Sequence, residues 1–348
     1  MTTQTTRRRG LARFVPAVAA VLGMSLVLAA CGGSDDEGNG GGGGDDVSVT
    51  FLPKNLGNPY FETSSKGGKA AVEEFEGTFK EVGPSEATPD SQVSYINTLT
   101  QQGTGAIAIS ANDPEAIGDA LQEARDAGTK VVTFDSDTKP EYRDLFVNQA
   151  DAKGIASKQV ELIAKAIGDQ GKIAILSASA NATNQNEWIK LMEEDLKANH
   201  PKIQLVETVY GDDDDQTSFD KTAALLQKHP DLKGIVSPTT VGIAAAARYL
   251  SDSQYKGKVQ LTGLGTPDQM REYVKNGTVG SFALWNPEDL GYLTAFAAKA
   301  LVDGDIKGEE GDTFEAGKLG EYTVGADGVV LLGDPLEFNK DNIDDFQF

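Results

Sequence analysis

Hydrophobic residues between positions 47 and 302 fall into short apolar runs that alternate with longer amphipathic stretches. The short runs are rich in β-branched residues and predict strands, whereas apolar residues at helical spacing predict helices. The predicted strands are 47–52, 78–82, 106–110, 130–134, 172–177, 204–210, 234–237, 259–263 and 281–284. The first predicted helix begins at Pro59, and the others are 91–102, 114–127, 152–167, 187–199, 218–228, 241–250, 268–276 and 288–302. This alternation indicates βαβ units and parallel sheets.

The alternation is interrupted near Gln149 and then restarts. We therefore expect an α/β fold of two doubly wound lobes, with a single barrel as the alternative, because about eight to ten strands would also suffice for a barrel. In the tail, 320–324 and 329–332 flank a turn at 326–328, a pattern that predicts a hairpin packed back on one lobe.

The first thirty residues have a different character. Four arginines lie between residues 7 and 13, and the apolar run 17–30 ends in small residues directly before Cys31, the only cysteine. This order predicts a signal peptide at 1–30, and the placement of Cys31 resembles the lipobox of bacterial lipoproteins, which implies lipidation. An uncleaved anchor is the alternative, but the run is shorter than the ~20 residues that a span needs. The Gly- and Asp-rich residues 31–46 predict a flexible tether.

The composition limits the class of partner. The chain has 348 residues and a net charge of −22. Without the four arginines of the signal peptide, 27 basic residues face 53 acidic ones, and the net charge becomes −26. A chain this acidic is repelled by nucleic acid and by anionic lipid, so we expect no nucleic-acid partner. The single cysteine leaves no pair for an internal disulfide.

Signatures of enzymes are missing from the sequence. It contains no Gly-x-Ser-x-Gly, His-Glu-x-x-His, Walker loop or Gly-x-Gly-x-x-Gly motif. His200 and His229 each precede a proline at a predicted helix end, where an imidazole commonly caps carbonyl groups. The acidic run 212–215 predicts a solvated loop that caps the next helix, although a calcium site is the alternative. We therefore expect no enzymatic activity, no cofactor and no metal.

Polar side chains follow the predicted strands of both halves. Ligands of open α/β sheets bind beyond the carboxyl ends of the strands, so these side chains predict a shared cleft. Their amide, carboxylate, ammonium and aromatic groups suit a sugar better than a phosphate. Asp135 would accept sugar hydroxyls, and Lys54 would offset its buried charge. The residues are Lys54, Asn58, Asp135, Asp137, Asn184, Gln185, Pro238, Thr239, Thr240, Trp285 and Asn286.

Six motifs carry a resemblance to a known family. They are Pro-Lys-Asn-Leu-Gly-Asn-Pro-Tyr-Phe (53–61), Phe-Asp-Ser-Asp-Thr-Lys-Pro (134–140), Asn-Gln-Asn-Glu-Trp (184–188), Ser-Pro-Thr-Thr-Val-Gly (237–242), Ala-Leu-Trp-Asn-Pro (283–287) and Phe-Asn-Lys-Asp-Asn-Ile-Asp (338–344). With them the mature domain resembles periplasmic sugar-binding proteins of the ribose-binding-like superfamily, the receiving subunits of ATP-driven importers. It is most similar to the branch of rhamnose-binding and autoinducer-2 (AI-2)-binding proteins.

The resemblance implies the type I periplasmic binding protein fold, with two lobes joined by three hinge strands and the ligand between them. The expected lobes are 47–149 plus 286–303 and 150–285 plus 304–348. The ligand would contact several of the strand-end residues, with Tyr60 or Phe61 against the apolar face of the sugar and Asn286 near a hinge. The residues carried over to the pocket are Lys54, Asp135, Asn184, Gln185, Pro238 and Thr240.

The resemblance also limits the ligand and the location. AI-2 binders have an aspartate where Asn184 stands and an alanine where Thr240 stands, so the sequence favours L-rhamnose over AI-2 or another pentose or hexose. We expect a monomer, lipid-anchored through Cys31 on the extracytoplasmic side (periplasm or cell surface), that delivers its sugar to membrane permease subunits. A receptor-coupled sugar sensor, a transcriptional regulator of the same fold and an exported α/β enzyme are the alternatives.

Overall fold

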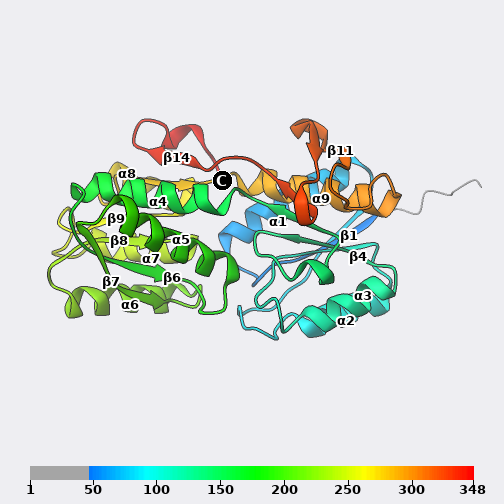
Figure 1. Cartoon of the computed structure of the whole chain (residues 1–348), viewed down its shortest axis with the longest axis horizontal. Helices are drawn as coiled ribbons and strands as arrows, with labels where there is room; N and C mark the ends of the chain where they lie inside the picture. The colour runs from blue at the N-terminus through cyan, green and yellow to red at the C-terminus, as the bar shows by residue number, and fades with distance from the viewer. Residues whose placement is uncertain (1–46) are drawn as a thin grey trace, which may run out of the picture. The chain divides into compact units, whose positions relative to one another are not determined.

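The computed structural model describes residues 47–348, so the predicted signal peptide, Cys31 and the tether lie outside the described residues. In the first lobe, where Figure 1 labels β1 and β4, a parallel sheet has the strand order β13-β5-β4-β3-β1-β2. Its strands are β1 (Ser48–Leu52), β2 (Thr78–Glu81), β3 (Ala106–Ile109), β4 (Lys130–Phe134), β5 (Leu145–Asn148) and β13 (Val329–Leu331). The order reverses between β1 and β3, which is where doubly wound sheets bind ligands.

Helices cover both faces of this sheet, because its strands are apolar on both sides. Alternate strand residues such as Leu52 and Ile107 pack under α2 (Val93–Gln102) and α3 (Gly118–Asp126). The opposite face, which includes Phe51, is covered by α1 (Pro59–Glu74) and α9 (Pro287–Asp303).

Glycines bring α1 and α9 together. A Cβ at Gly67 would lie 1.8 Å from the Glu288 carbonyl oxygen, and a Cβ at Gly291 would lie 1.8 Å from that of Ser64. Both helices begin with the same device, an asparagine N-cap followed by proline, as at Asn58 and Pro59. The backbones of the two helices are therefore in direct contact.

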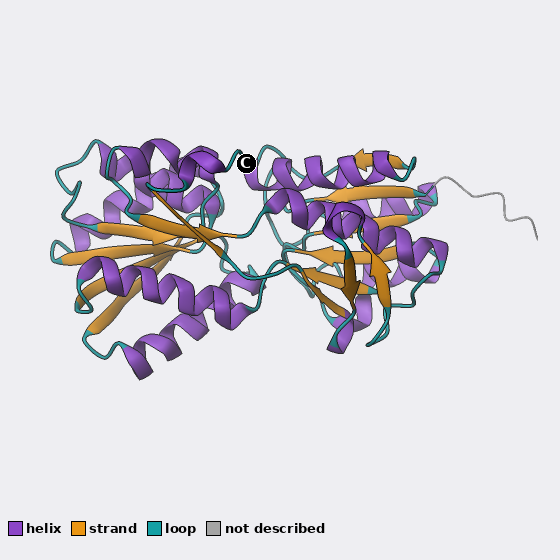
Figure 2. Cartoon of the chain, turned by 90° about the horizontal axis from the view of Figure 1, so that it is seen from above, coloured by secondary structure: helices purple, strands orange, loops and turns teal. Residues whose placement is uncertain are grey.

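The second lobe repeats the arrangement with a smaller parallel sheet of order β7-β6-β8-β9. Its strands are β6 (Gly171–Ser177), β7 (Ile203–Tyr210), β8 (Leu232–Ser237) and β9 (Gln260–Gly263). The helices α4 (Ala152–Ile167) and α5 (Thr183–Asn199) cover one face, and α6 (Asp215–Lys228) and α7 (Thr240–Ser251) cover the other, with α8 (Pro267–Lys275) beside α7. Figure 2 shows the strands of each sheet between helices.

The chain passes between the lobes three times, which confirms the predicted three-strand hinge. It leaves the first sheet after β5, returns between β10 (Ser281–Leu284) and α9, and leaves again between β13 and β14 (Leu336–Asn339). There β14 pairs antiparallel with β10, which touches β9 through a bridge between Leu264 and Ala283. Two separate sheets exclude the single barrel.

The tail differs from the sequence prediction. The expected hairpin is wrong, because β12 (Glu321–Thr323) pairs antiparallel with β11 (Thr313–Glu315), and β13 instead extends the first sheet parallel to β5. Residues 304–331 therefore lie with the first lobe and not with the second, where 304–348 was placed. Val330 is fully buried, and the edge of β5 offers hydrogen bonds that an isolated hairpin cannot match.

The remaining elements are short. Strands β5, β11 and β14 were not predicted, and α5 begins at Thr183, four residues before its predicted start at residue 187. The 3₁₀ helices are η1 (Pro140–Tyr142), η2 (Gly317–Leu319), η3 (Ala326–Gly328) and η4 (Ile343–Asp345). Across residues 47–348, none of the helices has the length and apolar character needed to cross a membrane.

Candidate ligand-binding site

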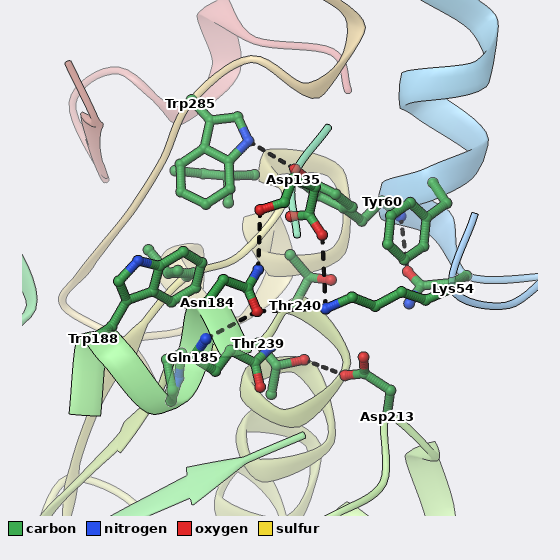
Figure 3. A pocket seen from close by; sticks show the side chains of 15 residues that line it. Lys54, Tyr60, Asp135, Asn184, Gln185, Trp188, Asp213, Thr239, Thr240 and Trp285 are labelled. Atoms are coloured by element: carbon green, nitrogen blue, oxygen red, sulfur yellow. Dashed lines mark hydrogen bonds and ion pairs between the residues drawn. The ribbon is translucent and has the colours of Figure 1, made fainter. Parts of the chain in front are cut away.

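A cavity that contains about 370 Å³ of space between protein atoms lies at the carboxyl ends of strands from both sheets (Figure 3). Eleven of the thirteen binding residues named from the sequence line it, and the other two, Asp137 and Asn286, do not. The lining residues are Lys54, Asn58, Tyr60, Phe61, Asp135, Asn184, Gln185, Trp188, Asp213, Pro238, Thr239, Thr240, Leu264, Leu284 and Trp285. The topology therefore brings together side chains that are up to about 230 residues apart in sequence.

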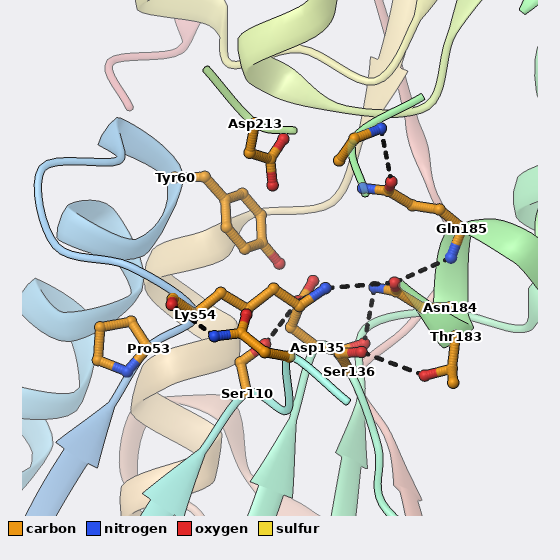
Figure 4. Close-up of polar contacts among 12 residues, drawn as sticks. Pro53, Lys54, Tyr60, Ser110, Asp135, Ser136, Thr183, Asn184, Gln185 and Asp213 are labelled. Atoms are coloured by element: carbon orange, nitrogen blue, oxygen red, sulfur yellow. Dashed lines mark hydrogen bonds and ion pairs between the residues drawn. The ribbon is translucent and has the colours of Figure 1, made fainter. Parts of the chain in front are cut away.

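A buried charge pair occupies one side of the cavity. Lys54 follows β1, Asp135 follows β4, and Lys54 Nζ lies 3.8 Å from Asp135 Oδ2, with both side chains less than a tenth exposed. The same carboxylate oxygen accepts a hydrogen bond of 2.8 Å from the Ser110 hydroxyl (Figure 4). Burial of a lone charge is costly, so the attraction between the two opposite charges offsets part of the cost of burying them.

Asp135 is held in a strained backbone conformation. Its φ is +60°, and the Ser136 N–H donates to the Phe134 carbonyl across it at 2.6 Å, which closes a three-residue turn. A non-glycine residue at positive φ costs of order 1–3 kcal/mol, and such residues gather at functional sites. The turn directs the carboxylate into the cavity instead of along the strand.

Two amides of the first turn of α5 face this pair. The Asn184 side chain bridges the lobes, because its Oδ1 accepts from Lys54 Nζ at 3.4 Å and its Nδ2 donates to the Asp135 carbonyl at 3.3 Å. The Gln185 Oε1 accepts from the Ser177 hydroxyl and from the Ala178 N–H, both at 3.0 Å. The amide orientations are thus set by the protein before a ligand binds.

Aromatic rings form the apolar wall. Trp285 Nε1 donates to the Tyr60 hydroxyl at 2.9 Å, and the two rings meet edge to face with centroids 6.1 Å apart. Trp188 continues the wall at 6.0 Å from Trp285. Burial and the negative charge of Asp135 raise the pKa of Tyr60 well above its usual value, so this hydroxyl stays protonated.

Sequence reasoning missed one polar residue of the cavity. Asp213, in the loop after β7, was assigned to a solvated acidic loop, but its Oδ1 accepts a hydrogen bond of 2.5 Å from the Thr239 hydroxyl beside the cavity. Burial raises the pKa of the Asp213 carboxyl. Its position at the end of a strand was the available signal. Trp188, Leu264 and Leu284 were also missed, because apolar residues at helical or strand spacing are usually core.

The two predicted residues outside the cavity have other partners. Asp137 accepts hydrogen bonds from Arg143 Nε at 2.7 Å and Nη2 at 2.9 Å, and it lines a second cavity next to the first. Burial raises the pKa of Asp137, although Arg143 opposes that shift. Asn286 caps α9 by accepting from the Glu288 N–H at 3.0 Å.

The geometry of the cavity suits a small neutral ligand with several hydroxyl groups. Carboxylate oxygens accept from hydroxyls, Lys54 donates, and the amides can do both. The aromatic wall would cover an apolar face of the ligand and exclude water from it. In the part of the chain that the structure describes, no group of three or more His, Cys, Asp or Glu side chains is arranged to hold a metal ion.

Comparisons with known proteins agree with this geometry. Residues 49–306 match the family model described as a periplasmic binding protein domain. A crystal structure described as a sugar ABC transporter from Actinomyces odontolyticus is 55% identical with a TM-score of 0.71, over 86% of this chain and 97% of that one. A solute-binding protein of an ABC transporter from Clostridium phytofermentas with bound L-rhamnose is 38% identical with a TM-score of 0.83, over 86% and 98% of the two chains.

A third solved structure is more distant in sequence. LsrB from Clostridium saccharobutylicum, in complex with AI-2, is 28% identical with a TM-score of 0.82, over 87% of this chain and all of that one. The family model covers well over half of the chain, and the two lobes, three crossings and shared cavity have the architecture expected for it. The chain therefore belongs to the periplasmic binding protein family.

Proposed function

We propose that this chain is the sugar-binding subunit of an ABC importer and that its ligand is L-rhamnose. The observation that carries the proposal is the cavity, in which a buried carboxylate paired with Lys54 lies opposite two oriented amides and an aromatic wall. Hydrogen bonds between sugar hydroxyls and a charged partner contribute ~1.5–3 kcal/mol each. Binding of a sugar is sufficient to explain why these groups are arranged in this way, without any catalytic role.

The methyl group of rhamnose distinguishes it from most hexoses. A 6-deoxyhexose needs an apolar surface for this methyl group, and Phe61, Leu264 and Leu284 supply apolar surface in the same cavity as the polar groups. Burial of one such group is worth ~0.8 kcal/mol. The 38% identity to a protein with bound L-rhamnose supports the same ligand class.

Asn184 and Thr240 argue against AI-2. The Asn184 amide donates to the Asp135 carbonyl while accepting from Lys54, and an ionised aspartate there could not make the first contact. Thr240, 7% exposed at the start of α7, adds a hydroxyl and bulk where alanine would leave room. A ligand that leaves such groups unpaired loses ~1–3 kcal/mol per group, or roughly ten- to a hundredfold in affinity.

The cellular setting is part of the proposal. The order of a basic segment, an apolar run and small residues before Cys31 supports export and lipidation at that cysteine. The chain would then act outside the cytoplasm, in a periplasm or at a cell surface, and hand its sugar to permease subunits. We infer that it does so as a monomer.

Titration calorimetry tests the ligand. The mature protein should bind L-rhamnose at micromolar concentration or below and AI-2 at least about tenfold more weakly. The double variant Asn184→Asp/Thr240→Ala should narrow or reverse that preference. Asn186→Asp, at a half-buried position of the same helix turn that does not line the cavity, serves as the charge-matched control. Tighter binding of AI-2 by the wild type would overturn the rhamnose assignment. Binding of neither ligand, nor of a pentose or another hexose, would overturn the sugar-binding function.

A further inference from the structure

The four consecutive aspartates after β7 have four different environments. Asp214 caps α6 by accepting from the Thr217 N–H at 2.7 Å, and Asp215 forms an ion pair with Arg248 on α7. Asp212 is exposed to solvent. Asp213 alone turns into the cavity, where it is half-buried. Only one member of this acidic run is therefore placed to meet a ligand.

The backbone of the loop imposes this direction on Asp213. The φ angles of Asp212 and Asp213 are +55° and +50°, which side-chain-bearing residues rarely adopt. The loop is held by hydrogen bonds from the Gly211 N–H to the Ser177 carbonyl at 2.8 Å and from the Asp212 N–H to the Ala178 carbonyl at 2.9 Å. A Cβ at Gly211 would lie 2.1 Å from the Ser218 hydroxyl oxygen, so the turn needs glycine before the acidic run.

The cavity thus contains two aspartates at positive φ, one from each lobe. Asp135 follows β4 of the first sheet, and Asp213 follows β7 of the second. Backbone strain that persists at two cavity residues points to a use for both side chains. Figure 4 shows the Asp213 carboxyl group directed toward the space bounded by Tyr60, Lys54 and Gln185.

The Asp213 carboxyl has capacity left for a ligand. Its Oδ1 accepts from the Thr239 hydroxyl, which anchors the group against α7 (Figure 3). Among residues 47–348, no donor reaches its Oδ2 within hydrogen-bond distance. A carboxyl oxygen can accept from a hydroxyl, and a protonated carboxyl can also donate to one. Burial raises the pKa of the Asp213 carboxyl and therefore favours its protonated form, which can donate to a hydroxyl as well as accept from one.

We propose that Asp213 contacts the bound sugar and determines specificity, by binding a hydroxyl group on the side of the ligand opposite Asp135. This inference rests on the proposed function and extends it with a residue that the family resemblance did not supply. With Asp135, it gives the cavity two carboxyl groups against the single ammonium group of Lys54. The site therefore selects neutral sugars and rejects sugar acids and sugar phosphates, whose negative charge no second cation would balance.

Calorimetry on matched variants tests this role. Asp213→Asn and Asp213→Ala should bind L-rhamnose about ten- to a hundredfold more weakly than the wild type. Asp212→Asn, which removes the same charge from the neighbouring exposed position, should bind within about twofold of the wild type. Cooperative thermal unfolding of each variant verifies that it is folded.

Deoxy analogues separate a direct contact from a structural role. The 2-, 3- and 4-deoxy analogues of L-rhamnose should each bind the wild type more weakly, and for one of them Asp213→Ala should cause no further loss. The inference would be overturned, while the proposed function stands, if Asp213→Ala weakened the binding of all three analogues equally. It would also be overturned if Asp213→Ala did not weaken the binding of L-rhamnose itself. If the wild type binds neither L-rhamnose, AI-2 nor D-ribose, the proposed function fails and the inference fails with it.

Discussion

Removal of the Asp135 carboxylate should have separate effects on ligand binding and on stability. Lys54 and Asp135 are both less than a tenth exposed and 3.8 Å apart, and Lys54 Nζ would keep only the 3.4 Å contact to Asn184 Oδ1 after Asp135→Ala. Loss of one partner from a buried pair costs about 3–5 kcal/mol. The 3.8 Å separation is long for an ion pair, so we expect the free energy of unfolding to fall by about 3 kcal/mol, at the lower end of that range.

A double-mutant cycle isolates this coupling. In Lys54→Met/Asp135→Ala neither buried charge remains, so its loss of unfolding free energy should be smaller than the sum of the two single losses by at least about 1 kcal/mol. Binding of L-rhamnose should nevertheless be lost in every variant that lacks Asp135. The measurements are urea unfolding and titration calorimetry on the same preparations.

Asp137→Ala is the matched control for this cycle. Asp137 lies two residues away and pairs with Arg143 at 2.7 Å, but it does not line the cavity. This variant should lose stability and keep its affinity for the sugar. Additive losses in the cycle would refute the buried-pair argument, and normal sugar binding by Asp135→Ala would refute the site itself.

Three further predictions concern the anchor, the lobes and pH. Cys31→Ser should leave an unprocessed precursor without lipid, and equal incorporation of a clickable fatty acid in mutant and wild type would contradict this. Because cavity residues come from both lobes, sugar should reduce the radius of gyration in small-angle scattering, whereas an unchanged radius at saturation would indicate a rigid pocket. Burial raises the pKa of Asp213 above 3.8 despite Lys54 nearby, with Asp135 and Asp212 adding to the rise. The unliganded folded chain therefore binds this proton more tightly than the unfolded chain does. The difference in unfolding free energy between the wild type and Asp213→Asn should fall as pH rises from about 4 through the raised pKa, and it should not change further above that pKa. Urea unfolding across this range would refute the argument if the difference did not change with pH.

Local interactions made much of the secondary structure predictable. The helix predicted at 152–167 is observed with those bounds, because the Asp151 side chain caps its first turn and Gly168, at φ +71°, ends it. In the same way Asn58 and Pro59 define the start of α1. These signals depend on residues within a few positions of one another, so a single sequence contains them.

The strand-end rule also identified most of the cavity. Parallel strands bring their carboxyl ends to one edge, so Lys54 and Asp135 could be placed together without knowledge of any contact between them. The rule does not say to which side a loop residue turns. Asp135 enters the cavity whereas Asp137 turns to Arg143, and Asp213 enters whereas Asp212 faces solvent.

Tertiary structure decided the partners of the tail strands and the direction of the acidic loop. The continuous apolar run at residues 329–332 predicts a strand, but it does not determine which strand pairs with it. The edge of β5 became the partner because the folded chain returns there. Asp213 is directed by backbone hydrogen bonds of its loop to the end of β6 and by the hydroxyl of Thr239, which follows β8. Sequence patterns determine local conformation and burial, whereas pairings between distant segments depend on which surfaces the folded chain brings together.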